Sequence, residues 1–170
     1  MSGEAQESLS SAGRGGGLAI SLRSAASSIR ASDGREIPFA RAMLTVRNNY
    51  STDVVDLVPH ASLGQEGGTV QNVTHAFAGT APASIPPGGS VAWDVYDLLL
   101  PAHPGTASKV HMFGYRAVLN WRFELSAWAE YRPKGSSGPQ KTPMARWALW
   151  WSVPDRASGA VALTIEEVKE

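Results

Sequence analysis

The 170-residue chain contains no cysteine, which excludes disulfide bridges, thiolate metal sites and a cysteine nucleophile. It also has no apolar run close to the roughly 20 residues that cross a bilayer as a helix. Its first residues lack the basic start and the apolar core of a signal peptide. We therefore expect a protein without disulfides that stays in the cytoplasm by default, or is released by a non-classical route.

Large apolar side chains are scarce in residues 1–17, which are rich in serine and glycine. Such a segment cannot bury enough apolar surface to offset the entropy lost on ordering. We predict a flexible N-terminal arm over residues 1–17 and a single folded domain over residues 18–170. Arg14 is the only basic residue in this arm, so we do not expect nucleic acid as a partner.

Patterns that mark catalytic or metal sites are missing as well. The glycine pairs match neither a Walker motif nor a dinucleotide fingerprint, and no serine lies in a GxSxG elbow. Four scattered histidines show no metal-ligand spacing: His60, His75, His103 and His111. We therefore expect no metal, no cofactor and no enzymatic activity.

The most informative stretch covers residues 115–132, YRAVLNWRFELSAWAEYR. Every second residue from Tyr115 onward is apolar or aromatic, whereas seven of the nine intervening residues are polar. Because strand side chains alternate between faces, this pattern predicts a strand with one dry and one polar face. At about 3.3 Å per residue its length would approach 60 Å. We therefore expect a bend or bulge near Asn120 or Ser126, and a strand that two sheets share.

Further alternating segments, separated by turns rich in proline and glycine, predict the remaining strands. They cover residues 40–47, 54–58, 70–77, 91–95 and 144–153, with a closing strand from residue 161. Pro59 is expected to end its strand or to confine it to a sheet edge. Residues 18–30 fit either a strand or an amphipathic helix, and the local alternation slightly favours a strand. These segments predict an all-β fold, an antiparallel β-sandwich of immunoglobulin-like or cytolysin-like type.

Residues 144–153 follow a predicted loop and form the second strand of a hairpin. We predict that Arg132 lies opposite Met144, which sets Leu125 opposite Trp151 on the dry face. A slip of one residue would place the dry face of one strand against the polar face of the other.

Two tryptophans, Trp128 and Trp150, fall on the polar face, and the predicted register makes them diagonal neighbours. An exposed aromatic pair surrounded by cations suits a membrane interface, a nucleic-acid base or a protein partner. Alternatively, a second layer covers this face and both tryptophans belong to the core. The candidate binding residues are the two tryptophans and four nearby cations: Arg132, Lys134, Lys141 and Arg146.

The net charge of zero conceals an uneven distribution. Residues 42–108 hold one basic and five acidic side chains, whereas residues 109–146 hold seven basic and two acidic ones. The two segments therefore carry opposite charges. They either neutralise each other within one fold or provide complementary faces for self-association or an anionic partner.

Four strings in the chain resemble the small cytolysin sandwiches of the aegerolysin and actinoporin type: VRNNYST, PPGGS, ALWWSVP and GAVALTIEEV. The resemblance implies a sandwich that recognises lipid headgroups through surface aromatics, with pore formation in some members. The chain has only four tyrosines and lacks that family's dense tyrosine and tryptophan lipid site, so no site residue is carried over.

The expected function is therefore a non-catalytic binding or assembly module, a structural or adaptor subunit of a larger assembly that is homo-oligomeric or of viral type. Its partner would be another protein or a second copy of the chain. The alternative is a peripheral protein that binds anionic membrane lipid in the manner of a cytolysin.

Overall fold

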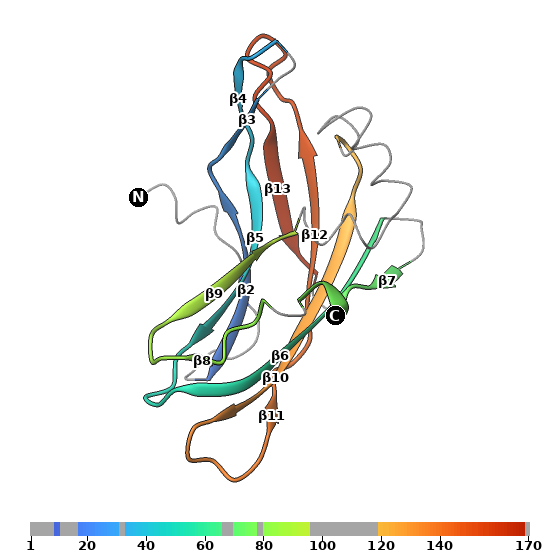
Figure 1. Ribbon diagram of the computed structural model, residues 1–170. Helices are drawn as coiled ribbons and strands as arrows, with labels where there is room; N and C mark the ends of the chain where they lie inside the picture. The colour runs from blue at the N-terminus through green and yellow to red at the C-terminus, as the bar shows by residue number, and fades with distance from the viewer. Residues whose placement is uncertain are drawn as a thin grey trace.

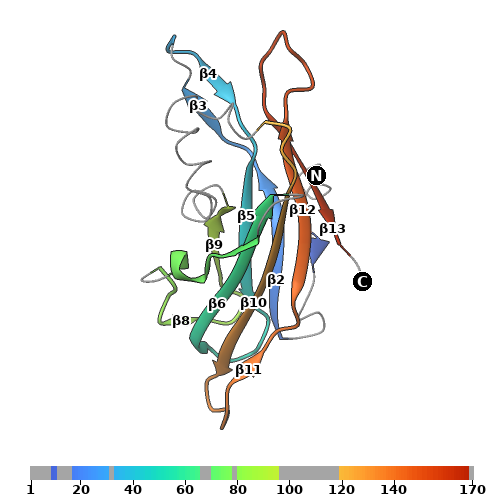
Figure 2. The ribbon, with the colours of Figure 1, turned by 90° about the vertical axis from the view of Figure 1, so that its right-hand side faces the viewer.

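The computed structural model describes residues 9–10, 17–30, 33–65, 70–77, 80–95 and 119–168. Two antiparallel sheets pack as a β-sandwich, which confirms the predicted all-β fold class (Figures 1 and 2). The smaller sheet contains, in order, β1 (Leu9–Ser10), β2 (Leu18–Ala25), β5 (Arg41–Asn48) and β9 (Ser90–Asp94). A separate hairpin joins β3 (Ser28–Arg30) to β4 (Glu36–Pro38).

The larger sheet has seven strands and includes the predicted hairpin. Its main order is β13 (Ala162–Glu167), β12 (Ala145–Ser152), β10 (Phe123–Pro133), β6 (Val54–Gln65) and β7 (Val70–Asn72). Two short strands complete it: β11 (Gln140–Lys141) pairs with β10, and β8 (Ser84–Ile85) pairs with β6. The sequence predicted a strand over residues 70–77, but β7 ends at Asn72 and the 3₁₀ helix η2 (Thr74–Phe77) follows it.

The core lies between the two sheets and contains the dry face of β10. Phe123, Leu125 and Tyr131 are buried, as the alternation predicted. From β12 come Trp147, Leu149 and Trp151, and from the smaller sheet Leu18, Ile20, Leu22, Ala42, Leu44 and Val46. These alternating positions confirm that residues 18–25 form a strand rather than a helix.

The predicted 18-residue strand is interrupted at Asn120, one of the two positions proposed for a bend. Asn120 has a φ of 65°, in the left-handed region, which lies outside the extended conformation of a regular strand. Strand β10 begins only at Phe123. The described residues of this stretch, from Leu119 onward, pair only with the larger sheet, so they are not shared between two sheets as predicted. The bulge predicted at Ser126 is absent; the ladder between β10 and β6 shifts register between Glu130 and Arg132 instead. Residues 115–118 lie outside the described residues.

The register predicted for the β10–β12 hairpin is wrong by four residues. Leu125 lies opposite Trp147 rather than Trp151. The hairpin is tighter than expected because β11 already pairs with Tyr131 and Glu130, inside the segment that was predicted to be a loop. Between this pairing and the pairing of Ala127 with Ala145, the returning strand holds one additional residue, which forms a bulge.

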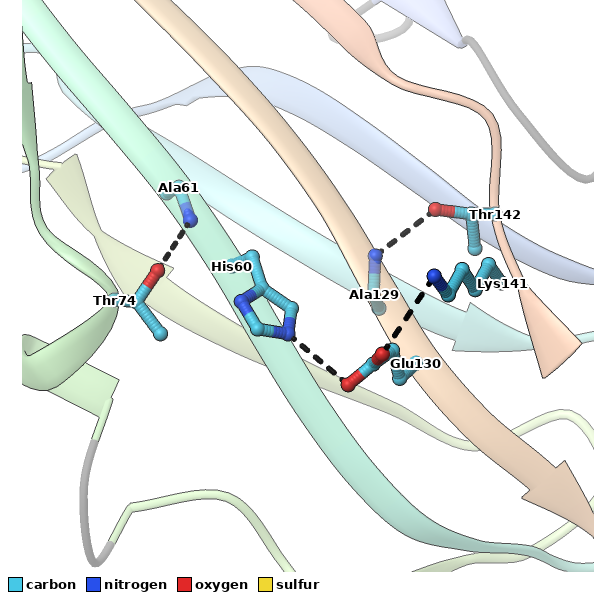
Figure 3. Close-up of polar contacts among 7 residues, drawn as sticks. All are labelled: His60, Ala61, Thr74, Ala129, Glu130, Lys141 and Thr142. Carbon is cyan, nitrogen blue, oxygen red and sulfur yellow. Dashed lines mark hydrogen bonds and ion pairs between the residues drawn. The ribbon is translucent and has the colours of Figure 1, made fainter. Parts of the chain in front are cut away.

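Thr142 satisfies the backbone groups at this bulge (Figure 3). The backbone N–H of Ala129 donates to Thr142 Oγ1 at 3.0 Å, and the backbone N–H of Thr142 donates to the Ala129 carbonyl at 3.0 Å. A side-chain oxygen thus replaces one backbone acceptor of the ladder. The shift by an even number of residues still keeps dry face against dry face.

Pro59 neither ends its strand nor lies at an edge, contrary to the prediction. It lies in the middle of β6, opposite Ala129. Two residues further along, the backbone N–H of Ala61 points away from β10, toward Thr74 Oγ1. Backbone nitrogens two residues apart on a strand face the same side, so the Pro59 nitrogen, which carries no hydrogen, also faces away from β10. Neither β8 nor β7 pairs with β6 at that position, so no ladder bond is lost.

The turn predicted around Asp33 and Gly34 joins β3 to β4, and Gly34 has the expected positive φ of 90°. Of the predicted arm over residues 1–17, the structure describes residues 9–10 and 17. Leu9 and Ser10 form β1 and pair with Leu22 and Ser21. Residues 1–8 and 11–16 lie outside the described residues.

Tyr131 makes the fold sensitive to alkaline pH. Its hydroxyl lies 2.9 Å from that of Tyr50, and burial together with this hydrogen bond raises the pKa of Tyr131. As pH rises, Tyr131 therefore loses its hydroxyl proton first in the unfolded chain, near pH 10. This deprotonation favours the unfolded chain, so the stability that Tyr131 contributes below pH 10 is lost above it. We expect wild-type stability to fall more steeply above about pH 10 than that of Tyr131→Phe, by up to ~1.4 kcal/mol per pH unit. Urea unfolding between pH 8 and pH 11 measures the difference, and parallel curves for the two proteins would contradict the prediction.

Candidate functional site

The outer face of the larger sheet is the side turned away from the core, and the even-numbered residues 124–132 of β10 form its central row. Glu124 is exposed, and Ser126, Trp128, Glu130 and Arg132 are half-buried. Trp150 on β12 is also half-buried. The alternative in which a second layer buries both tryptophans in the core is therefore wrong. The outer face is accessible to a binding partner.

Trp128 belongs to a group of four side chains, each of which contacts two of the others, and which we call the aromatic cluster: His60, Trp128, Glu130 and Lys141. The pairing of β6 with β10 sets His60 opposite Trp128, and their rings stack at 4.1 Å with an interplanar angle of 10°. Lys141 Nζ lies 5.4 Å from the centre of the Trp128 ring, within the range of a cation–π interaction.

Glu130 connects the two basic members of the aromatic cluster (Figure 3). Its Oε1 lies 3.3 Å from His60 Nε2, and its Oε2 lies 4.0 Å from Lys141 Nζ. These contacts hold the indole of Trp128 in one orientation. Trp128 therefore loses less side-chain entropy when a partner binds it.

An apolar groove of about 390 Å³ lies on the same face. Among the described residues four large apolar side chains are exposed, and three of them border this groove: Val70 at 62%, Met144 at 54% and Val168 at 39%. Ser62, Glu124, Ser126 and Arg146 supply its polar margin. The groove therefore joins side chains from β6, β7, β10 and β12 and the residue that follows β13.

Trp128 and Trp150 are not neighbours, contrary to the prediction, because the observed register moves them apart along the hairpin. Trp128 lies beside His60 of β6, whereas Trp150 lies opposite Thr164 of β13. The guanidinium of Arg122 covers the Trp150 ring at 4.5 Å and also contacts Glu166 at 3.1 Å. The two tryptophans thus belong to separate groups of side chains.

The four predicted cations are distributed along the outer face and the adjoining turn. Arg132 Nε donates to Asp56 Oδ2 at 3.0 Å, and Lys134 is exposed in the turn after β10. Exposed Arg146 lies opposite Ser126, which makes it the diagonal neighbour of Trp128 on this face. These three and Lys141 share the face with Asp56, Glu124 and Glu130, so among the described residues four positive charges meet three negative ones, in addition to the ion pair of Arg122 with Glu166. The surface is therefore close to neutral.

Sequence reasoning missed His60 and the apolar border of the groove. In the sequence His60 is one of four scattered histidines without metal-ligand spacing, and this pattern gives no signal that it stacks on Trp128. Met144 stood on the polar side of the predicted alternation, which was the available signal for its exposure. Val70 and Val168 lie far from Met144 in the chain, so only the sheet order brings the three together.

The described residues contain no group of three or more histidine, cysteine or acidic side chains that could hold a metal ion. No helix within the described ranges is long and apolar enough to cross a membrane. Comparisons of the chain with known protein families, with curated proteins and with solved structures find no match.

Proposed function

We propose that this protein is a non-catalytic binding module that docks an extended segment of a partner protein on its outer face, as a subunit or adaptor of a larger assembly. The observation that carries the proposal is the position of the apolar groove beside the aromatic cluster. Arg146 lines the groove and is the diagonal neighbour of Trp128, so the two features form one continuous surface.

The dimensions and charges of this surface define the partner segment. A groove of about 390 Å³ accommodates one or two large side chains rather than a folded domain. Two exposed cations lie along this surface: Arg146 lines the groove, and Lys141 lies beside Trp128, opposite Glu130. Both can bind a carboxylate. We therefore infer a segment in which an apolar side chain enters the groove and an acidic side chain follows it.

A selection from a random peptide library on the immobilised full chain tests this function. We expect selected peptides to combine an apolar residue with an acidic one. A Met144→Asp substitution should weaken their binding at least about tenfold, because it replaces an apolar contact worth ~1.5–3 kcal/mol and adds a repelling charge. Fluorescence anisotropy of a labelled peptide measures the change.

Ala92→Asp is the matched control, since Ala92 is an exposed residue of β9 in the other sheet. It adds the same charge far from the groove and should leave the affinity unchanged. Two results would refute the proposed docking surface. One is an equal loss of peptide affinity in both variants, and the other is unchanged affinity for Met144→Asp.

The second candidate function is peripheral binding to anionic membranes, and the half-exposure of both Trp128 and Trp150 favours it. The near balance of four positive and three negative charges favours a protein partner instead, because each net basic residue adds only about 1 kcal/mol of attraction to an anionic leaflet. Vesicles of phosphatidylcholine with and without phosphatidylserine separate the two. We expect no blue shift of tryptophan fluorescence; a shift that Trp128→Ala abolishes would establish the membrane function.

A further inference from the structure

Among the residues that the structure describes, strand β13 is at the edge of the larger sheet and pairs only with β12. It makes six consecutive pairs, Trp147–Glu167 to Ser152–Ala162, without a register shift. The described strand at the opposite edge, β7, has only three residues. Figure 2 shows β13 at the margin of the sheet, beside β12.

The backbone groups of three residues of β13 point to the open side. The N–H of Val168 donates to the carbonyl of Arg146 in β12, so even-numbered residues of this strand face β12. Leu163, Ile165 and Glu167 therefore direct their N–H and C=O groups away from β12. Within the described residues none of these groups has a backbone partner, whereas Val161 just before them bonds to Pro38 and Ala40.

Proteins usually protect such an edge with proline, charged side chains, a bulge or a very short strand. Strand β13 is six residues long, has no proline and pairs regularly, and its only charges, Glu166 and Glu167, lie at its end. Its outward hydrogen-bonding groups form a template for one more antiparallel strand.

We propose that a second copy of this chain occupies this edge, so that β13 of each protomer pairs antiparallel with β13 of the other and the two larger sheets become continuous. A two-fold axis beside Ile165 sets Ile165 opposite its own counterpart and Leu163 opposite Glu167. All three outward-facing residues of each copy then form hydrogen-bonded pairs. The segment bonded to Val161 prevents the pairing from extending further in that direction.

The side chains agree with this register. Glu166 lies opposite Thr164, and Glu167 lies opposite Leu163, so no two carboxylates face each other across the interface. Ala162 lies opposite Val168, whose side chain is 39% exposed in the single chain. Partly buried Leu163 and Ile165 already pack on the core, so Ile165 would meet its counterpart on the core side of the joined sheets, with a Glu167 at each margin of this contact.

Disulfide trapping tests the register directly, because the natural chain has no cysteine. Cα atoms of a hydrogen-bonded antiparallel pair lie about 5.5 Å apart, which suits a disulfide. Full-length Ile165→Cys should therefore form a covalent dimer under mild oxidation. Ala162→Cys is the control, since its two copies would lie six residues apart along the pairing, roughly 20 Å. Equal rates of cross-linking in the two variants would overturn the proposal.

Light scattering over a concentration series provides the second measurement. The wild type should approach twice the chain mass of 18.0 kDa, and Glu167→Pro should raise the dissociation constant at least tenfold by removing an outward N–H. Glu167→Gln removes the charge but keeps the N–H, so it should dimerise like the wild type. A wild-type mass that stays at 18.0 kDa at every concentration would overturn the proposal.

Val168 borders the groove and also lies in this interface, so the variants that separate the two proposals are placed at Met144 and Glu167, which belong to only one of them each. Met144→Asp should abolish peptide binding and leave the cross-linking of Ile165→Cys intact. Glu167→Pro should do the reverse.

Discussion

Replacing Trp151 with alanine is expected to lower the free energy of unfolding by about 3–5 kcal/mol. Trp151 is 1% exposed, and its ring packs against Phe39 and Phe123 with centroids 6.1 and 6.4 Å apart. Its indole N–H also donates to the carbonyl of Ala40 at 2.8 Å, which ties β12 to the chain entering β5 in the other sheet. The substitution would leave both a large cavity and an unpaired carbonyl. Urea unfolding followed by circular dichroism measures the loss.

Trp150→Ala is the matched control, because it removes the same type of side chain at the adjacent position of the same strand. Trp150 is half-buried on the outer face, and Arg122 covers its ring. We expect a loss of about 1 kcal/mol or less, the value of a partly exposed cation–π contact. Similar losses in the two variants would contradict the assignment of Trp151 to the core and of Trp150 to the surface.

Asn48→Ala should destabilise the fold by roughly 3 kcal/mol or more, because it breaks three side-chain hydrogen bonds at a fully buried position. Asn48 Nδ2 donates to the carbonyls of Thr52 and Ile85, both at 2.8 Å, and Asn48 Oδ1 accepts from the backbone N–H of Tyr50 at 2.8 Å. The side chain therefore joins the end of β5 to its own following turn and to β8. Thermal and urea unfolding both measure the effect.

Asn49→Ala provides the comparison, since the adjacent side chain is exposed and accepts one hydrogen bond within the described residues, from Arg47 Nε at 3.1 Å. Its loss should stay within about 0.5 kcal/mol, as is usual for surface substitutions. Asn48→Asp should be as damaging as Asn48→Ala, because its oxygen would face two carbonyl oxygens. A cost for Asn48→Ala no larger than that for Asn49→Ala would show that the buried network contributes nothing.

The alternation of side chains was sufficient to predict which face of each strand is buried. Leu125 and Trp147 fall on the dry face by sequence alone, and both are fully buried. The turn at Gly34 and the interruption at Asn120 were also predictable, because they depend on backbone preferences that act within a few residues. The same alternation indicated the outer position of Trp128 and Met144.

The register of the hairpin was not predictable from this pattern. A period of two assigns a side chain to a face, but it is unchanged when the partner strand slides by any even number of residues. The choice among even shifts depends on β11, on the Thr142 bulge and on the packing of Trp151 against Phe39, which no local pattern contains.

The composition of the candidate surface likewise required the tertiary structure. The sequence shows that Val70, Met144 and Val168 are apolar, but not that they border one groove. Pro59 led to the prediction that the strand ends before His60. In the fold the Pro59 nitrogen faces a side on which no described strand pairs, so the strand continues. The sequence by itself therefore determined the buried faces of β2, β5, β10 and β12, because these follow from covalent geometry and local hydrophobicity. Only the tertiary structure decided which strands become neighbours, because that choice depends on contacts between residues far apart in the chain.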